Sequence, residues 1–283
     1  MALGKKGHEL TVKILRYIII LVFVIPMMLP LLWMFSTALK EGNMVFTNPP
    51  QWIPKTFAWE NFSKGLETVH FWSRFVNTLF ITVLCCIGQV LSCMCVGYAI
   101  GRIKFPGRKV WFYMIVGTMM LPGMVTLIPV FKVWSTLGFV NSYVPLIVPA
   151  FLGSPFYTFM VRQFMTTIPR SYDEAARIDG ASRLQILIRV IAPMCKPVMA
   201  TIVVMQFQAS WNDYLAPLLY IIDDTKWTLA IGIAQMSNSN YGVQWNTLMA
   251  ADVVYLLPML LLFFLAQDFF MQGLGSMNYA GVK

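Results

Sequence analysis

Residues 168–193 read IPRSYDEAARIDGASRLQILIRVIAP and form a charged interruption in a largely apolar chain. Ser171 and Glu174 have the S-x-x-E spacing of a capping box, which predicts that a helix begins there. Gly180 favours the left-handed conformation in which helices end, so this helix has about nine residues and is about 13 Å long. The stretch therefore predicts a short polar helix outside the apolar parts of the fold.

A second short helix is expected to follow the first. Ser182 predicts its N-cap, and Pro193 predicts the end of the segment before the next apolar run. Ala175 and Ala176 give the first helix a low surface that another backbone can approach closely. An apolar side is predicted from Ile178, Leu184 and Leu187. A helix that lies on a membrane prefers bulky apolar residues and lysine, so this pair is predicted to fit a socket on another protein.

The composition of the whole chain indicates a membrane protein. Of its 283 residues, 58% are hydrophobic and only 12% are charged, whereas a soluble domain has about 25% charged residues. The net charge of +9 comes from cations grouped in short segments between apolar runs. This grouping is typical of membrane orientation, so we expect a lipid bilayer as partner and no nucleic acid.

Six apolar runs are long enough to cross a bilayer, which needs about 20 residues each. The alternation of a barrel strand is absent, so the runs are predicted to be helices. The first run is too long for a cleaved signal segment, whose apolar part has about 7–15 residues. The predicted spans cover residues 14–38, 71–100, 110–133, 143–165, 198–222 and 248–271.

The distribution of cations predicts the orientation. With six spans, both termini and the segment 168–193 lie on one side, and fifteen of the 21 Lys and Arg residues lie there too. Because cytoplasmic loops are enriched in Lys and Arg, both termini are predicted to be cytoplasmic.

Two of the runs contain helix-breaking residues. Proline removes a backbone hydrogen bond and kinks a helix. Such breaks are found where transporter helices line a water-filled path, but proline is also simply common in spanning helices, and both interpretations stay open. The residues concerned are Pro122, Gly123 and Pro129 in the third run and Pro145, Pro149, Gly153 and Pro155 in the fourth.

The segment 168–193 resembles a known motif. Glu174-Ala175-Ala176, three residues, Gly180, nine residues and then Val190-Ile191-Ala192-Pro193 resemble the EAA loop of permeases in binding-protein-dependent ABC importers. The usual ending of that loop is I-x-L-P, and here it is V-x-A-P. The resemblance implies a coupling helix that sits in a groove of the ATPase subunit. The implied coupling residues are Ser171, Asp173, Glu174, Ala175, Ala176, Asp179 and Gly180.

Further stretches resemble the carbohydrate branch of these permeases, with a pattern most similar to the smaller permease of maltose-type importers. They are Trp52-Ile53-Pro54, Trp59-Glu60-Asn61-Phe62, Ser210-Trp211-Asn212-Asp213-Tyr214, Thr228-Leu229-Ala230 and the tail Ala280-Gly281-Val282-Lys283. The resemblance implies an all-α membrane protein with six transmembrane helices and the type I ABC importer permease fold. It divides the chain into an N-terminal segment with the first helix and outer loop (1–70), a transmembrane domain (71–275) and a cytoplasmic tail (276–283).

The same resemblance implies a set of partners. They are a second permease subunit, an ATPase dimer, an extracytoplasmic solute-binding protein and a sugar substrate, in the cytoplasmic membrane of a bacterium or archaeon. The tail is expected either to reach the ATPase dimer or to be a frayed terminus.

The chain itself lacks the motifs of an ATPase or a metalloenzyme. No G-x-x-x-x-G-K-[ST] loop occurs, so ATP and Mg²⁺ are expected in the partner ATPase, and no cofactor is expected in this chain. The chain is therefore expected to be a transporter subunit and not an enzyme. Only two histidines occur, and four of the five cysteines lie in one apolar run, so no metal site is predicted.

Polar residues inside the runs are candidates for a solute path, since they are costly in a membrane and tend to face a cavity. Asp213 is the strongest candidate, because a carboxylate within a span needs a reason. Pairing with another helix or capping a break near Pro217 would also explain it. The candidates are Asn77, Gln89, Gln206, Gln208, Trp211, Asn212, Asp213 and Tyr214.

Three other functions compete with a sugar permease. A permease for another solute, such as a polyamine or phosphonate, would share the coupling loop but is not expected to have the stretch at 210–214. A membrane-embedded enzyme needs paired acids or a histidine cluster, and the spans contain chiefly Asp213, Asp252 and Asp268 and no histidine. A channel or transporter that works alone has no use for a docking helix.

Overall fold

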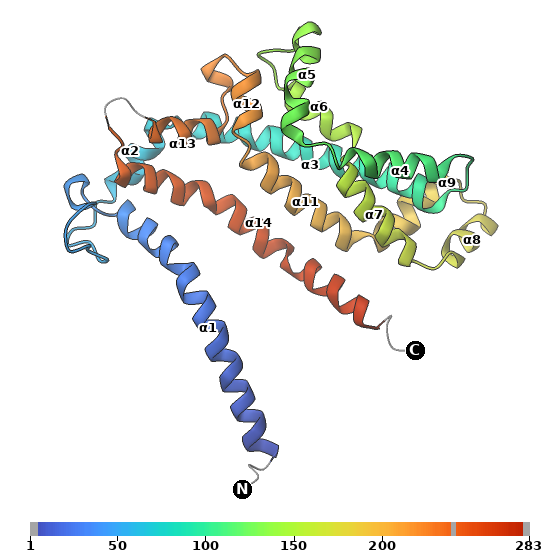
Figure 1. The fold of residues 1–283 in the computed structure, drawn as a ribbon, viewed down its shortest axis with the longest axis horizontal. Coiled ribbons are helices and arrows are strands. Elements are labelled where there is room, and N and C mark those ends of the chain that lie inside the picture. Colours follow the sequence, from blue (N-terminus) through green and yellow to red (C-terminus); the bar gives the residue numbers. More distant parts are fainter. Residues whose placement is uncertain (1–4, 239–241, 280–283) are drawn as a thin grey trace. The chain divides into compact units, whose positions relative to one another are not determined.

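The computed structural model describes residues 5–238 and 242–279, and its side chains over 7–238 and 242–267. Every regular element in these ranges is a helix (Figure 1). The chain divides into two compact units, which we describe separately. The first comprises Met1–His70 and Ile233–Leu256, and the second comprises Phe71–Gly232 and Leu257–Lys283.

The first unit is built around the ends of two long helices, α1 (Lys5–Ala38) and α14 (Trp245–Tyr279). Ala38, Ala250 and Val253 form its small apolar core. The loop after α1 contains a short 3₁₀ turn (Gly42–Met44) and α2 (Glu60–Thr68), and α13 (Leu229–Ser237) ends in this unit.

A buried asparagine holds this unit together. The Asn61 amide donates to the carbonyls of Ala38 and Lys40 at 2.9 and 2.8 Å, and its oxygen accepts a bond from Asn246 at 3.0 Å. The Lys40 ammonium is buried 3.9 Å from the centre of the Trp33 ring. Burial lowers the pKa of Lys40.

The second unit is organised around α3 (Phe71–Arg102). The helices α6 (Val144–Leu152), α7 (Pro155–Thr167) and α11 (Lys196–Trp211) pack against it. The core includes Cys93, Val161, Met165, Ile186, Ile191 and Ile202, all fully buried. Gly97 allows α3 and α7 to approach closely, because a Cβ atom there would lie 2.5 Å from Val161 Cγ1.

Four described helices are long and apolar enough to cross a membrane. They are Gly7–Ala38, Phe71–Arg102, Val144–Thr167 and Trp245–Gln267. These match the first, second, fourth and sixth predicted runs, and the fourth is made of α6 and α7. The predicted break at Gly153 is confirmed, because Gly153 has φ +87° between these two helices.

The third run is broken, as its proline and glycine residues predict, whereas the fifth run differs from the predicted continuous span. The third is divided into α4 (Arg108–Thr118) and α5 (Gly123–Thr136), bent by 100°. Pro122 lies at this break in extended conformation, and it supplies no backbone N–H to continue a helix. Counted as single spans, the bent pairs raise the total to six.

The predicted span 198–222 is wrong in its boundaries. The helix α11 ends at Trp211, and a separate α12 (Leu215–Tyr220) follows. The apolar partner of α11 is instead the preceding helical stretch Arg183–Met194, to which it is bent by 80°. At the carboxyl end, α14 continues to Tyr279, into the predicted tail, whereas residues 280–283 lie outside the described part.

Candidate functional site

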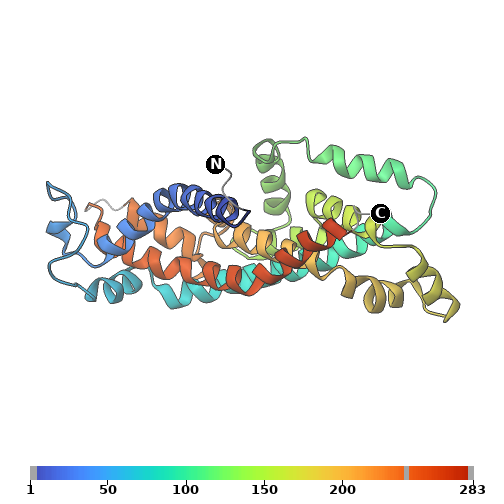
Figure 2. The ribbon, with the colours of Figure 1, turned by 90° about the horizontal axis from the view of Figure 1, so that it is seen from below.

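The predicted polar helix is present as α8 (Ser171–Ile178), which lies with α9 (Arg183–Gln185) at one end of the second unit (Figures 1 and 2). Its start and its glycine stop are confirmed, with Gly180 in the left-handed region at φ +79°. The predicted capping box at Ser171 is wrong, because Arg170 is the N-cap and no side chain caps the helix. The capping box is formed instead by Ser182 and Gln185, at the start of α9.

The segment after α9 does not end at Pro193 as predicted. The chain continues through a π-helical stretch (Ile186–Ile191) and α10 (Ala192–Met194), and the break falls at Cys195. Pro193 lies near the end of the unbroken helical stretch Arg183–Met194, two residues after the π-helical part. A nearly continuous helical path with one sharp bend therefore leads from α9 to α11.

The two sides of α8 differ in what they contact. Glu174 and Ala175 are exposed, and Ile178 is 86% exposed. Ala176 packs against the core of the second unit. Of the other predicted coupling residues, Ser171, Asp179 and Gly180 are exposed and Asp173 is buried. In the described part of the chain, no other segment covers this exposed side, so another protein can reach it.

Asp173 points back into the protein, where it meets Arg102 at the end of α3. The Arg102 Nε donates to Asp173 Oδ2 at 2.8 Å, and Nη2 bonds to the same oxygen. The two side chains are 5% and 10% exposed. Because both charges are buried, each depends on the other for compensation.

Arg102 also binds the end of α7. Its Nη1 donates to the carbonyls of Met165 and Ile168 at 2.6 and 2.9 Å, and Nη2 donates to that of Pro169 at 3.0 Å. The planar fork of a guanidinium allows this set of bonds, which a lysine cannot reproduce. One arginine thus joins α3, the carboxyl end of α7 and α8.

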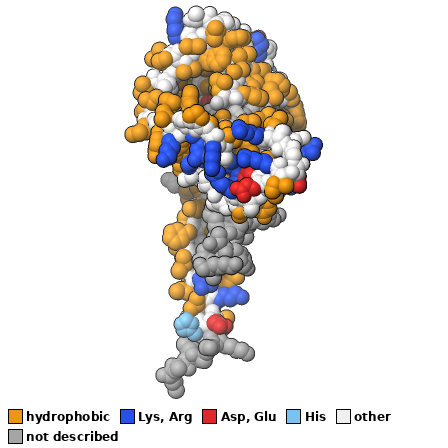
Figure 3. Space-filling view, turned by 90° about the vertical axis from the view of Figure 1, so that its right-hand side faces the viewer, with side chains coloured by type: hydrophobic (Ala, Val, Ile, Leu, Met, Phe, Trp, Pro, Cys, Tyr) orange, Lys and Arg blue, Asp and Glu red, His pale blue; other side chains and the backbone are white. Residues whose placement is uncertain are grey.

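Sequence reasoning missed Arg102 as a site residue. Arg102 was counted only among the cations that predict the membrane orientation. An arginine at the end of a long apolar helix nevertheless suggests a carbonyl or carboxylate partner. That partner lies 71 residues away in the sequence. Figure 3 shows the face at this end of the molecule, where Lys and Arg side chains gather around a few acids.

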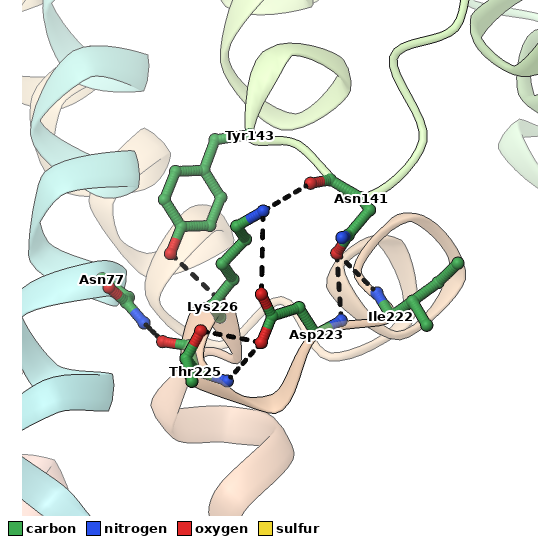
Figure 4. Close-up of polar contacts among 7 residues, drawn as sticks. All are labelled: Asn77, Asn141, Tyr143, Ile222, Asp223, Thr225 and Lys226. Atoms are coloured by element: carbon green, nitrogen blue, oxygen red, sulfur yellow. Dashed lines mark hydrogen bonds and ion pairs between the residues drawn. The ribbon is translucent and has the colours of Figure 1, made fainter.

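The candidate path residue Asn77 takes part in a network of loops, which we call the Asn141 network (Figure 4). Its amide donates to the carbonyls of Thr225 and Trp227 at 2.9 and 3.1 Å. Asn141 adopts the left-handed conformation at φ 63°, and its side-chain oxygen accepts from two backbone N–H groups, at 3.2 and 3.0 Å. The network comprises Asn77, Asn141, Tyr143, Ile222, Asp223, Thr225 and Lys226.

Charged groups close the same network. Lys226 Nζ lies 3.1 Å from the Asn141 carbonyl and 3.8 Å from Asp223. The Tyr143 hydroxyl donates to the Lys226 carbonyl at 3.1 Å. Hydrogen bonds from the Thr225 side chain and backbone, with Lys226 nearby, lower the pKa of Asp223. Asn77 therefore holds a loop in place in this conformation.

Three further path candidates face the core or their own helix. Gln89 is buried, and its amide lies 3.0 Å from Cys93 Sγ. Gln206 donates to Ser210 at 2.7 Å. Trp211 is 1% exposed and stacks on Phe207, with ring centres 5.3 Å apart. Each of these contacts lies within one helix, and Trp211 also meets Phe75 of α3, with ring centres 5.7 Å apart.

Asp213 caps the break between α11 and α12. Its Oδ1 accepts from the Ala216 N–H at 3.2 Å, which agrees with the structural role considered for it. It also lines a cavity of about 20 Å³ together with Ser210 and Thr228. That volume accommodates about one water molecule.

The remaining candidates are exposed. Gln208 lies in the last turn of α11, and Asn212 follows as the C-cap, where its amide donates to the Gln208 carbonyl at 2.9 Å. Tyr214 is 40% exposed. Elsewhere on the spans, the exposed side chains are mainly apolar, as expected for a lipid-facing surface.

The fold and these sites define a class: a helical membrane protein with a short, largely exposed polar helix at one end of its second unit. The chain matches the family model for binding-protein-dependent transport system inner membrane components over residues 94–276. It therefore belongs to this family of permease subunits.

Relatives and solved structures agree with this assignment. The chain is 34% identical, over 92% of its length and 95% of the relative, to the sn-glycerol-3-phosphate transport system permease protein UgpE of Pectobacterium atrosepticum. It is 27% identical to the probable ABC transporter permease protein YurM of Bacillus subtilis, over 94% of this chain and 88% of the relative.

A crystal structure of a bacterial ABC transporter that imports the acidic polysaccharide alginate contains a chain with the same fold. The TM-score is 0.82 at 22% identity, over 95% of this chain and 99% of that one. This likeness confirms the predicted helical ABC permease fold.

Proposed function

We propose that this chain is one of two permease subunits in an importer for a carbohydrate or related polyhydroxylated solute. A partner ATPase dimer powers the importer, and an extracytoplasmic binding protein delivers the solute. The observation that carries the proposal is α8, a helix with one exposed side of small and acidic residues and one side held to the protein by Arg102. The proposal places the chain in the membrane with six spans, the bent pairs counted as one span each, and with both termini in the cytoplasm.

The exposed side of α8 is the proposed contact with the ATPase. Glu174, Ala175 and Ile178 supply an acid, a low surface and an apolar anchor on a rigid element. The adjacent Gly180 lets the chain turn away sharply, since its φ of +79° is strained for other residues. The proposal keeps the division of the chain into segments 1–70, 71–275 and 276–283. The tail, 276–283, is proposed as a second contact with the ATPase.

The exposed amides of α11 are the proposed contribution of this chain to the solute path. Gln208 and Asn212 offer both donors and acceptors, as sugar hydroxyls require. Residues 197–222 contain no Lys or Arg, so this side suits a neutral polyhydroxylated solute better than an anion. The named substrates of the relatives, sn-glycerol-3-phosphate and alginate, are polyhydroxylated as well as anionic.

The proposed cycle uses the broken helices. ATP closes the partner ATPase dimer and moves α8 with it, and the permease then changes between inward and outward openings. The breaks at Pro122, Gly153 and Cys195 are the places where such helices can change direction.

The first test is purification in mild detergent with the permease, ATPase and binding protein encoded by neighbouring genes. We expect a complex of all subunits whose ATP hydrolysis rises when the binding protein is loaded with one sugar of a tested panel. A chain that purifies without an ATPase would contradict the proposal. If a binding protein loaded with a polyamine or phosphonate stimulates ATP hydrolysis instead, the substrate is that solute and not a sugar.

The second test reverses the charge on the docking side. Glu174→Arg is expected to abolish binding-protein-stimulated ATP hydrolysis, because it puts a long cation into the proposed socket. Glu60→Arg is the matched control, since Glu60 is an exposed acid on α2 whose pair with Lys64 contributes little. If the loaded binding protein stimulates ATP hydrolysis as strongly in Glu174→Arg as in Glu60→Arg, α8 is not the docking element.

A further inference from the structure

We propose that the ion pair between Arg102 and Asp173 transmits the movement of α8 directly into α3. Arg102 is then a positioning residue for coupling, in addition to any part it has in stability. The inference rests on the proposed function, in which α8 docks on the ATPase. It concerns the route by which the movement enters the permease.

Residues 168–170 join α8 directly to the end of α7, and Ala176 packs against the core of the second unit. Two further routes lead from α8, one to α11 and one to α3. The covalent route runs through α9, the π-helical stretch Ile186–Ile191 and α10, and then bends by 80° at Cys195 into α11. A π-helical stretch and a sharp break are both places where a helix deforms readily. A push on α8 is therefore absorbed in part along this route.

The lateral route is shorter and stiffer. Asp173 lies within α8 and Arg102 within the last turn of α3, so one side-chain contact joins the two helices. The pair excludes water, and the same guanidinium is fixed by three backbone carbonyls at 2.6 to 3.0 Å. A charged pair in such a dry site resists separation far more than an exposed one.

A movement delivered to Arg102 reaches the whole unit through α3. This helix contacts α6, α7 and α11, and its 32 residues make a rod about 48 Å long. Near its other end, Asn77 holds the loop that carries Thr225. The helix α3 can therefore act as a lever between the docking end and the Asn141 network.

The alternative is that Arg102 only caps the carboxyl end of α7. The two interpretations predict different behaviour for a folded variant. If Arg102 only caps α7, Asp173→Asn leaves the carbonyl bonds intact and the folded complex responds normally to ATP. If the pair transmits movement, the folded Asp173→Asn complex still contains the ATPase and hydrolyses ATP. Its permease, however, no longer changes between the inward and outward openings.

The experiment measures ATP–vanadate responses of the full importer complex with two probes. The first is the distance between spin labels on α8, at Arg177→Cys, and on α3, at the exposed native Cys95. The second is the reaction of Gln208→Cys with a membrane-impermeant maleimide added from outside, with Cys95 changed to serine. Glu60→Gln, another acid-to-amide change, is the matched control.

In the wild type, we expect the label distance to stay the same and the maleimide reaction to rise by about fivefold or more, the usual lower range of coupling between sites. In Asp173→Asn, we expect the ATPase to co-purify, the label distance to shift with ATP–vanadate, and the maleimide response to be lost. Arg102→Lys is the second variant, and it should weaken the response even if Asp173→Asn fails to assemble.

The outcomes separate the two proposals. If either variant assembles and keeps both wild-type responses, the pair does not transmit movement and the inference is wrong, while the proposed function stands. If the wild-type complex contains no ATPase, or shows no maleimide response, the proposed function itself is wrong.

Discussion

The two ends of α3 each hold a loop in place, but they use different chemistry. At one end, Arg102 binds Asp173 and three carbonyls in a site almost closed to water. At the other, Asn77 binds two carbonyls in a partly exposed network of neutral and weakly paired groups. The first arrangement depends on one residue, whereas the second shares its bonds among seven.

This difference shows how a helix can be rigid at one end and adjustable at the other. A buried charge that loses its partner is costly, so the Arg102 end permits few intermediate arrangements. A network whose groups can bond to water instead loses little when one member is removed. The docking end is therefore expected to move as a unit, and the opposite end to adapt to different loop positions.

The largest effect is expected for Arg102→Met, which leaves Asp173 buried without its cation. Loss of one partner of such a pair costs about 3–5 kcal/mol. Hydrogen exchange over residues 171–178 should show this as a large fall in the local opening free energy. The double variant Arg102→Met with Asp173→Leu should recover part of the loss, because no unpaired charge remains. A double variant less stable than both singles would contradict the buried-pair interpretation.

A middle-sized effect is expected for Asn141→Ala in the Asn141 network. Alanine has no acceptor for the backbone N–H groups of residues 222 and 223, and the left-handed conformation costs it about 1–2 kcal/mol. Asn141→Gly is the matched variant, since it loses the same bonds without the conformational cost. Hydrogen exchange over 221–227 should rank the two, with alanine the less stable. Equal exchange in both would mean that φ 63° is not maintained.

A smaller effect is expected for Asn77→Ala. Two carbonyls lose their donor, but both lie where water can replace it, so the cost is about 1 kcal/mol. Asn77→Asp should be worse than alanine, because a carboxylate would face two carbonyl oxygens. The measurement is again the exchange of the 221–227 amides. If Asn77→Ala lowered the local opening free energy as much as Arg102→Met does, the two ends of α3 would not differ in the way described.

The smallest effect concerns the pH dependence of the same loop. The pKa of Asp223 is lowered in the folded loop, so the stabilisation is present above its ordinary value of about 3.9. It is lost as the pH falls through the lower folded value. Exchange of the Thr225 amide, corrected for its intrinsic pH dependence, should therefore increase only at low pH. In Asp223→Asn the increase with acid should disappear.

Much of the fold could be predicted from local patterns. Long apolar runs predicted the helices at 14–38, 71–100, 143–165 and 248–271, since backbone groups in a membrane must bond within their own helix. The start of α8 and its stop at Gly180 also followed from local preferences. The 100° bend between α4 and α5 did not follow, because Pro122 breaks a helix without indicating the direction of the chain beyond it.

The site was predicted less completely. The sequence motif marked α8, but it did not distinguish Asp173, which faces inward, from Glu174, which faces out. Among the path candidates, Gln89, Gln206 and Asp213 make hydrogen bonds within the fold. Gln208, Asn212 and Tyr214 are exposed.

The sequence by itself determined that this chain crosses a membrane as helices, that it has a short polar helix, and where its third and fourth runs break. Each of these properties depends on residues within a few positions of one another. Only the tertiary structure decided which polar groups hold distant parts of the fold together, because their partners are far apart in the chain. Arg102 meets Asp173 across 71 residues and Asn77 meets Thr225 across 148, and no local preference encodes such a pairing.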